Sequence, residues 1–282
     1  MERRKRTSGV GNMNISVIIV TRNNFDYFEK CMNALFEHTD FTDVELLIVN
    51  NNSSDRESKQ LIEWYEAQEF LTPDIPIQLI HNVTTESFAT NNNEAIRLTN
   101  SNYLMFLNDD TEVQENWLPP LLDCVESDER IVAVGPKMFY PNGMIQHCGI
   151  AFHKKDKMPG HIWLGKKPRD YPPAQIRRRF KAITGGAMFI SARVFKSLGG
   201  FDEAYKVCAY EDIDLCLKFE DEANRIYYEP KSEIMHHESV TQNKFDAKFR
   251  QGYFVANTKI FLDRWFEKIK PDYFDKTNGE EE

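Results

Sequence analysis

The first hundred residues alternate between short apolar runs and helical patterns, and this alternation constrains the fold more than any other feature of the chain. Runs rich in β-branched or aromatic residues predict buried strands over residues 14–20, 44–49, 77–80 and 103–107. Apolar residues at helical spacing predict helices over residues 25–38, 56–70 and 88–98. This order favours an α/β fold whose mostly parallel central sheet is flanked by helices, with a Rossmann-like nucleotide-binding half.

Polar side chains follow three of these strands where each strand ends. They fall in residues 21–24, 50–55 and 108–110. In parallel α/β sheets, ligands bind in the crevice at the carboxyl ends of the strands. The sequence therefore predicts one polar crevice at this edge of the sheet.

The second half of the chain has a less regular pattern. Strands are expected over residues 131–140, 187–191, 226–228 and 233–235, and helices over residues 118–124, 212–222 and 245–269. Residues 150–180 are rich in loop-forming residues and carry many Lys and Arg side chains. A loop of this length is often a lid or a binding segment, and the alternative is a solvated charged surface.

Composition excludes several classes of protein. The chain has 282 residues with 35 Lys and Arg against 44 Asp and Glu, a net charge of −9 that argues against a nucleic-acid binder. Its five cysteines form no CxxC pair, which makes a disulfide framework or a structural zinc site unexpected and favours a cytoplasmic location. No apolar run approaches the roughly 20 residues of a membrane helix. Residues 1–12 are expected to form a disordered basic arm, and residues 275–282 a disordered tail.

Two acidic pairs carry the clearest chemistry. Asp109 and Asp110 directly follow an apolar strand, where two carboxylates suit Mg²⁺ or Mn²⁺ and leave positions for phosphates. The alternative is a solvated turn. Glu211 and Asp212 open a predicted helix, where carboxylates either cap the helix or act as a general base.

Histidine and asparagine residues add two further candidates. His236 and His237 follow an apolar stretch, where an imidazole is either a metal ligand or a structural group. Asparagines near the predicted crevice could read a base and a ribose, or they could close turns. Since the chain has neither GxGxxG nor GxxxxGK[ST], bound phosphates would need a metal to neutralise them.

The order of the motifs is more specific than any one of them. Along residues 14–243 the chain carries VIIVTRNN, LLIVNNNSSD, FATNNNEAI, MFLNDDT, TGGAMFISARVFKSLGGFDEAY, YEDIDLCLK and EIMHHES. This series resembles the family 2 glycosyltransferases with the GT-A fold. It is most similar to bacterial enzymes that build O-antigens and other surface glycans, including rhamnosyltransferases, and the segment GMIQHCGIAF is similar to theirs too.

The resemblance implies roles for several polar residues at the nucleotide. The donor contacts that it implies are Thr21, Arg22, Asn23, Asn50, Asn52, Asp55 and Asn93. Asn50 stands where the family has the first acid of D-N-x-S-x-D, whose carboxylate contacts the uracil or thymine base and the ribose. Ala95 replaces the glycine of the family's N-x-G segment.

The resemblance also implies a metal site. Asn108, Asp109 and Asp110 match the D-x-D motif, with an asparagine in place of the first acid. Asp110 is therefore the expected ligand of Mn²⁺ or Mg²⁺, and Asn108 and Asp109 are expected to contact the donor. His236 matches the family's metal-binding histidine, and His237 is its close rival.

The catalytic residues follow from the same comparison. Asp212 matches the catalytic base of the E-D motif, with Glu211 beside it, and Gly185 and Gly186 match the loop on the acceptor side. The resemblance implies an inverting transferase in which Asp212 takes the proton of an acceptor hydroxyl.

These expectations define one functional hypothesis and one alternative. The chain would move a sugar from a UDP-hexose, a UDP-N-acetylhexosamine or dTDP-rhamnose to a glycan, lipid-linked or protein acceptor in surface-glycan biosynthesis. The alternative is a degenerate transferase that serves as a glycan- or nucleotide-binding scaffold, because Asn50 and Asn108 replace acids.

The expected organisation follows the same hypothesis. The catalytic domain would span residues 13–243, with a donor half (13–112) and an acceptor half (113–243). The helical segment 244–274 would pack on it, lie on the inner face of a membrane or form a homodimer.

Overall fold

A computed structural model describes residues 14–219, 224–237 and 247–270 of the chain. The arm predicted over residues 1–12 and the tail predicted over residues 275–282 lie outside the described residues. Four parallel strands form the first half of the main sheet, in the spatial order β4-β1-β2-β3. They are β1 (Ile15–Thr21), β2 (Val44–Asn51), β3 (Ile77–Asn82) and β4 (Tyr103–Asn108). The parallel α/β prediction is confirmed for this half.

The strands β1, β2 and β4 are mostly apolar on both sides because both faces of the sheet are covered there. Val17 and Ile19 pack with Phe28 of helix α1 (Phe25–His38) on one face, whereas Ile18 packs with Phe106 and the opposite core. Successive side chains of a strand point to opposite faces, so a strand buried on both sides reads as a continuous apolar run.

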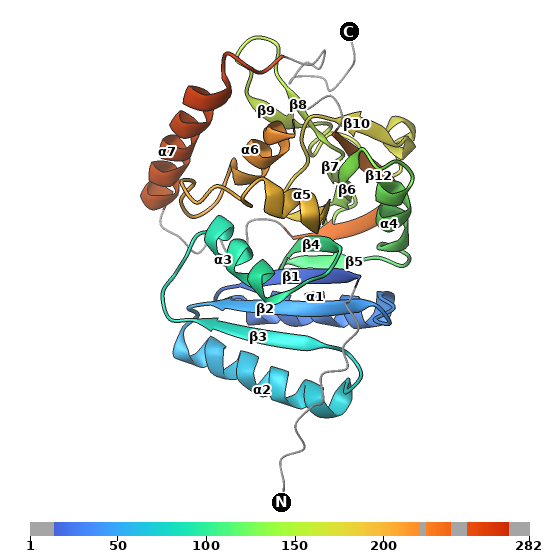
Figure 1. Cartoon of the computed structure of the whole chain (residues 1–282), viewed down its shortest axis with the longest axis vertical. Helices are drawn as coiled ribbons and strands as arrows, with labels where there is room; N and C mark the ends of the chain where they lie inside the picture. The colour runs from blue at the N-terminus through green and yellow to red at the C-terminus, as the bar shows by residue number, and fades with distance from the viewer. Residues whose placement is uncertain (1–13, 220–223, 238–246, 271–282) are drawn as a thin grey trace, which may run out of the picture.

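The second half extends the same sheet through antiparallel pairing. Strand β11 (Ala187–Ser191) runs antiparallel to β4 and links it to β6 (Ile131–Phe139), and β12 (Arg225–His236) is parallel to β6. The smaller strands are β5 (Thr111–Val113), β7 (Ile145–His147) and β10 (Arg178–Phe180), while β8 (Ile150–Phe152) and β9 (Pro159–His161) form a separate two-stranded sheet. Figure 1 shows the parallel half below and the mixed half above it.

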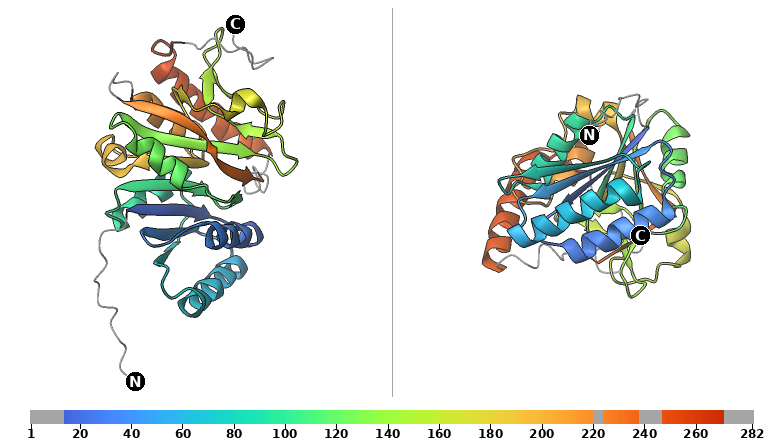
Figure 2. Two further views of the ribbon diagram at one scale, coloured as in Figure 1. Left: turned by 90° about the vertical axis from the view of Figure 1, so that its right-hand side faces the viewer. Right: turned by 90° about the horizontal axis from the view of Figure 1, so that it is seen from below.

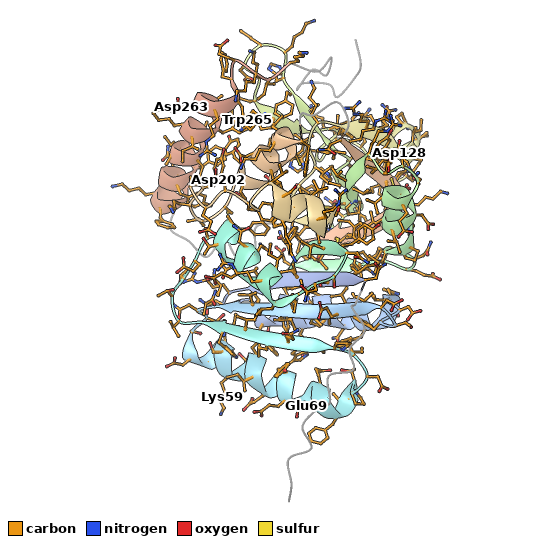
Figure 3. The ribbon with its side chains drawn as sticks, in the orientation of Figure 1. Lys59, Glu69, Asp128, Asp202, Asp263 and Trp265 are labelled. Atoms are coloured by element: carbon orange, nitrogen blue, oxygen red, sulfur yellow. The ribbon has the colours of Figure 1, made fainter. Side chains whose placement is uncertain are left out.

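Helices cover both faces of this sheet, as Figure 2 shows from two further directions. The first core contains side chains of α1 (Phe25–His38), α2 (Asp55–Leu71) and α4 (Pro119–Glu126). The opposite core contains side chains of α3 (Phe88–Ala95), η1 (Ile96–Leu98), α5 (Ala192–Ser197), α6 (Glu211–Lys218) and α7 (Ala247–Trp265). Lys59 and Glu69 lie on the outer, exposed face of α2 (Figure 3).

Three expectations for the second half need correction. The strands predicted over residues 226–228 and 233–235 are one strand, β12, which continues through Pro230 with a register shift between Glu229 and Glu233. A proline has no backbone N–H to donate, so a strand accommodates it at such a bulge. Residues 150–180 contain β8, β9, β10 and the 3₁₀ helix η2 (Pro172–Gln175) rather than loop alone. Helix α5 was not predicted.

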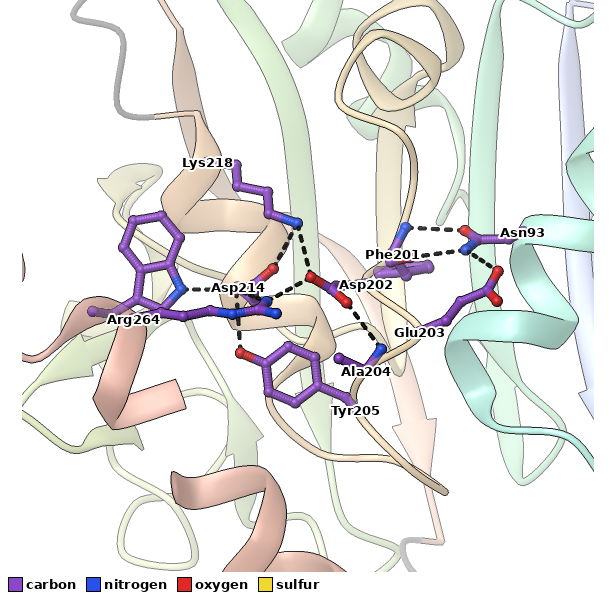
Figure 4. A network of polar contacts seen from close by, with 10 residues as sticks. Asn93, Phe201, Asp202, Glu203, Ala204, Tyr205, Asp214, Lys218 and Arg264 are labelled. Atoms are coloured by element: carbon purple, nitrogen blue, oxygen red, sulfur yellow. Dashed lines mark hydrogen bonds and ion pairs between the residues drawn. The ribbon is translucent and has the colours of Figure 1, made fainter. Parts of the chain in front are cut away.

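Helix α7 packs on α6 and the core around it, which is one of the three alternatives expected for residues 244–274. The indole Nε1 of Trp265 donates a hydrogen bond to Oδ1 of Asp214 at 2.8 Å, and Nη1 of Arg264 donates one to Oδ2 of Asp202 at 2.5 Å. Asp214 is fully buried on α6 and also pairs with Lys218 at 2.8 Å (Figure 4). This network fixes α7 to the helix that begins with Glu211. Within the described residues, no helix is long and apolar enough to cross a bilayer.

Candidate active site

A cleft of about 690 Å³ lies at the carboxyl ends of β1, β2 and β4, where the polar segments were expected to meet. Its walls also include residues from α3, β12 and the loop that precedes α6. Nine predicted site residues line it: Arg22, Asn108, Asp109, Asp110, Gly185, Gly186, Glu211, Asp212 and His236. The fold therefore brings the candidate metal ligands and the candidate base to one cavity.

Asp110 and His236 face each other at the floor of this cleft. The Oδ1 atom of Asp110 lies 2.9 Å from Nε2 of His236, and both residues are at least nine-tenths buried. Strand pairing sets this contact, because His236 pairs with Thr111, the residue that follows Asp110. The other ring nitrogen of His236, Nδ1, lies 2.8 Å from Oε1 of Gln146. An amide oxygen only accepts hydrogen bonds, so Nδ1 is the donor in this contact, and in the neutral ring Nε2 would present a lone pair to Asp110.

This donor set fits a hard divalent cation. A lone pair and a carboxylate oxygen that face each other are satisfied by a cation, and metal-binding histidines commonly donate their other N–H to an oxygen such as that of Gln146. The described residues contain no cluster of three or more His, Cys, Asp or Glu that could hold a metal ion by itself. Mg²⁺ and Mn²⁺ sites that use one or two protein ligands and substrate phosphates need no such cluster.

His237 points to a different environment. Its Nε2 lies 2.7 Å from Oε1 of Glu112, and its ring packs edge-on against Tyr27 with centroids 4.9 Å apart. Of the two adjacent histidines, only His236 lines the cleft.

The acidic pair at the start of α6 forms another wall. Asp212 is partly exposed and accepts hydrogen bonds through Oδ2 from the Gly185 N–H at 2.7 Å and through Oδ1 from the Ile213 N–H at 2.8 Å. Burial raises the pKa of Asp212 above its ordinary value, although these hydrogen bonds oppose the shift. Burial, together with the charge of Asp212, raises the pKa of Glu211 well above its ordinary value. An acid with a raised pKa is suited to proton transfer near neutral pH.

Two glycines let the walls approach each other. A Cβ atom on Gly185 would lie 3.1 Å from Cβ of Asp212, and one on Gly186 would lie 3.2 Å from Nδ2 of Asn108. The backbone N–H of Asn108 also donates to the Gly186 carbonyl at 3.0 Å. Glycine is required here by close approach, since neither residue has a positive φ.

The expected nucleotide residues divide into two groups. Arg22 lines the cleft, and so does Asn51, which the motif comparison did not select. Five other candidates do not line the cleft. Thr21 and Asn50 lie at the ends of β1 and β2, Asn23 and Asn52 lie in the turns that follow, and Asp55 is the first residue of α2.

Asparagine side chains hold these turns together. The Nδ2 of Asn50 contacts Oγ of Ser58 at 3.0 Å, and its Oδ1 accepts the Ser53 N–H at 3.0 Å. Asn23 accepts the Ser54 N–H at 2.7 Å. These amides support the β1 and β2 turns, whose backbone carries Arg22 and Asn51 into the cleft.

Asn93 lies outside the cleft lining. Its Nδ2 donates to the Phe201 carbonyl at 2.8 Å and to Glu203 at 3.0 Å, and its Oδ1 accepts the Phe201 N–H at 3.0 Å (Figure 4). A side chain at Gly200 could not fit, since its Cβ would lie 2.4 Å from Oδ1 of Asn93. In this structure Asn93 joins α3 to the turn after α5.

Sequence reasoning did not select several residues of the cleft. The additional lining residues come mainly from residues 85–88, the loop 206–209, Gln146, His161, Leu164 and Phe249. The segment GMIQHCGIAF was a signal for Gln146. The loop 206–209 carried no such signal, because it contains neither a glycine nor an acidic residue.

Comparison with known proteins identifies the family and the fold of this chain. The family model described as "Glycosyl transferase family 2" matches residues 16–198, more than half of the chain. The chain is 29% identical over 252 residues to "O-antigen biosynthesis protein RfbC" of Myxococcus xanthus. That match covers 87% of this chain but only 19% of RfbC, and the chain spans 27% of the length of a second curated relative.

Two solved structures show the same fold. GalNAc-T7 with UDP, GalNAc and Mn²⁺ superposes with a TM-score of 0.67 at 15% identity, over 90% of this chain and 49% of that one. The mannosyltransferase PcManGT of Pyrobaculum calidifontis with GDP-Man and Mn²⁺ gives a TM-score of 0.61 at 16% identity, over 93% and 66%. The chain belongs to glycosyl transferase family 2 and has the GT-A fold.

Proposed function

We propose that this cleft transfers a sugar from a nucleoside diphosphate to an acceptor hydroxyl, with inversion at the anomeric carbon and with Mn²⁺ or Mg²⁺ as cofactor. The observation that carries the proposal is the presence, in one cleft, of the facing pair Asp110 and His236 and of the hydrogen-bonded carboxylate of Asp212. Asp110 and His236 could hold a metal ion that is bound to the diphosphate, and the carboxylate of Asp212 could accept a proton.

Asp110 and His236 would hold the metal on the donor side. A divalent ion there would supply electrostatic stabilisation to the leaving diphosphate. Asp109, which is buried, and Asn108 lie beside this pair and would orient the donor sugar or its ribose. Arg22 and Asn51 extend the same wall toward the nucleotide.

Asp212 would accept the proton of the acceptor hydroxyl. The Gly185 N–H and the Ile213 N–H fix its carboxylate, so the base does not have to be ordered during the reaction. A single displacement in which the base and the leaving group lie on opposite faces of the sugar inverts the anomeric centre. Glu211, whose raised pKa favours its protonated form, would supply a neutral neighbour and limit charge repulsion.

The donor and the acceptor are proposed at the level of class. We propose a UDP-hexose, a UDP-N-acetylhexosamine or dTDP-rhamnose as donor, which makes the enzyme a hexosyl- or rhamnosyltransferase. The acceptor would be a glycan, a lipid-linked glycan or a protein in surface-glycan biosynthesis. The printed name of RfbC, an O-antigen biosynthesis protein, supports this choice.

We further propose that the enzyme works in the cytoplasm. All five cysteines lie in the described residues and are free thiols, which suits a reducing compartment. Contact with the inner face of a membrane is proposed through the basic side chains of residues 151–180, which are attracted to anionic lipid. A homodimer is the further proposal for the exposed side of α7.

A thermal-shift panel tests the donor site first. Purified protein is melted with UDP, dTDP, GDP and their sugars, each with and without Mn²⁺. A ligand at a hundred times its dissociation constant stabilises the folded state by about 2.7 kcal/mol. The proposal expects a metal-dependent shift with one nucleotide. The absence of a shift on folded protein would contradict the donor site.

Asp212→Asn tests the base with the donor so identified. We expect turnover to fall by about 10²–10⁴-fold, because that is the usual contribution of a general base. Nucleotide binding should persist, since Asp212 lies on the acceptor side of the cleft. Equal turnover in the variant and the wild type would exclude Asp212 as the base. Nucleotide binding without transfer in the wild type would support the scaffold alternative.

A further inference from the structure

The loop of residues 206–210 combines backbone strain with a position beside the acidic pair. Val207, Ala209 and Tyr210 have φ values of 63°, 90° and 75°, although none of them is glycine. Positive φ is rare for such residues, and for a β-branched residue such as Val207 it is an outlier. Backbone of this kind persists only where the surrounding structure determines it, and it is common in functional sites.

This loop forms part of the cleft and leads directly into the catalytic helix. Four of its residues line the cleft: Lys206, Val207, Cys208 and Ala209. Tyr210 is the residue before α6, whose first two residues are Glu211 and Asp212. The conformation of the loop therefore sets the starting point of α6 and the position of the Asp212 carboxylate.

One side chain from α7 satisfies the backbone of this loop. Asn257 is fully buried, and its Nδ2 donates to the carbonyls of Lys206, Cys208 and Ala209 at 2.9, 3.0 and 3.3 Å. Its Oδ1 accepts the Lys206 N–H at 3.0 Å. A carboxamide has two N–H groups, so both are engaged by these three carbonyls, and its oxygen accepts one hydrogen bond from the loop.

Neighbouring contacts complete the support of the loop. The Tyr210 hydroxyl lies 3.1 Å from Oγ1 of Thr258, and its ring stacks on Phe261 with centroids 4.9 Å apart. On the opposite side, the Phe88 N–H donates to the Val207 carbonyl at 2.7 Å. Asn257 is the residue that bonds the loop backbone at both its beginning and its end.

We infer that Asn257 is a positioning residue for catalysis: through the strained loop 206–210 it places Asp212 and the acceptor side of the cleft. The expected effect on kcat rests on the proposed function. The expected effect on the loop rests only on the contacts of Asn257. Helix α7 would therefore support the loop 206–210 in addition to packing on the rest of the domain.

The structural consequence is tested by hydrogen exchange, which needs no substrate. Asn257→Asp keeps the size and the acceptor but removes the N–H donors, and Asn257→Ala removes both. We expect faster exchange of the Lys206 and Phe88 amides in both variants, with exchange in β1 and β2 unchanged. Exchange at Lys206 and Phe88 equal to that of the wild type in a folded variant would overturn the inference.

The kinetic consequence is tested with the donor and metal found by thermal shift. We expect kcat to fall by about 10–100-fold, the scale of a displacement of the base by up to about 1 Å. The Kd of the nucleotide with Mn²⁺ should change by less than about threefold, since Asn257 bonds the loop that leads to Asp212. A kcat within about threefold of the wild-type value, despite faster exchange of the loop, would overturn the positioning role.

A matched control and a rescue separate this role from general destabilisation. Ser16→Ala removes another fully buried, hydrogen-bonded side chain, at the end of β1 away from the cleft, and should leave kcat and the exchange of Phe88 unchanged. Ala209→Gly combined with Asn257→Ala should recover part of the lost protection, because glycine adopts a φ of 90° without strain. Failure of this rescue, or loss of kcat in the Ser16 control, would count against positioning.

The two proposals fail in different ways. Wild-type protein that transfers no sugar would contradict the proposed function, while exchange at Lys206 and Phe88 would still test the contact between Asn257 and the loop. Active wild-type protein with unaffected Asn257 variants would contradict only the positioning role. If Asn257→Asp or Asn257→Ala does not fold, Asn257→Ser is measured in its place, because serine retains one hydroxyl donor at this position.

Discussion

Gly185→Ala should lower catalysis by displacing the base directly. The new Cβ would lie 3.1 Å from Cβ of Asp212, whereas carbon atoms at optimal contact are about 3.5–4.0 Å apart, an overlap of roughly half an ångström. A Cβ atom is fixed to its backbone, so a rotamer change of Asp212 cannot relieve this overlap. Phe88 limits movement in another direction, because Cε1 of its ring would lie 3.4 Å from the same Cβ.

The magnitude follows from this geometry. A displacement of about 1 Å can cost about 10²-fold in rate, so half of that displacement should cost about tenfold, or about 1.4 kcal/mol in the barrier. The overpacking should also cost about 1–3 kcal/mol of folding stability. The Kd of the nucleotide with Mn²⁺ should remain close to that of the wild type, because Gly185 lies on the acceptor side.

The assay compares steady-state turnover and melting temperature with those of Gly252→Ala. This control adds the same methyl group to an exposed position of α7 where no atom lies within 4 Å, and it should raise stability by about 0.5–1 kcal/mol. Turnover of Gly185→Ala within about twofold of the wild-type value would refute the reasoning, because the base would then tolerate the contact.

Three further predictions follow from the site and its supports. His236→Ala should abolish the Mn²⁺-dependent part of the nucleotide thermal shift, and EDTA should do the same to the wild-type protein. His237→Ala should retain most of that shift, and the reverse pattern would make His237 the metal ligand. Glu211 has a raised pKa in the folded state, so folding binds its proton and stability falls as pH rises above the ordinary carboxyl range. Melting curves between pH 5 and pH 8 should therefore show a smaller loss of stability in Glu211→Gln than in the wild type, and parallel losses would contradict the shift. Trp265→Phe removes the N–H that bonds the buried carboxylate of Asp214 and should cost about 1–3 kcal/mol in denaturant unfolding, which an unchanged midpoint would disprove.

The regular half of the fold was predictable because burial leaves a direct pattern in the sequence. β1 and β4 are covered on both faces, so residues 17–20 and 104–107 are apolar without interruption. The strand β12 was harder to predict, since Glu229 and Ser232 are buried polar residues in its interior and look like a loop. Glu229 is accommodated by its ion pair with Arg177 at 2.5 Å, a partner 52 residues away that no local pattern reveals.

The place of the candidate site was predictable from its titratable side chains. Asp110, Asp212 and His236 line one cleft, as their motifs indicated. Asparagines were ambiguous because one amide can contact a ligand or close a turn. Asn51 lines the cleft although its amide bonds the backbone of Glu86, and the amide of its neighbour Asn50 is bound to Ser58 and Ser53. The role of Asn257 had no sequence signal, since positive φ in the loop it holds occurs without glycine.

The distance between the donor and acceptor sides of the cleft is set by the register of the sheet. β11 pairs with β4 so that Ala187 lies opposite Leu107, and the next bond joins the Asn108 N–H to the Gly186 carbonyl. Gly185 then holds Asp212, so two hydrogen bonds connect the D-x-D segment to the candidate base. A slip of one residue would exchange the faces of β11 and separate these groups. Because the pairing of β11 with β4 places Gly186 against Asn108, the two halves of the chain line one cleft only when they share one sheet.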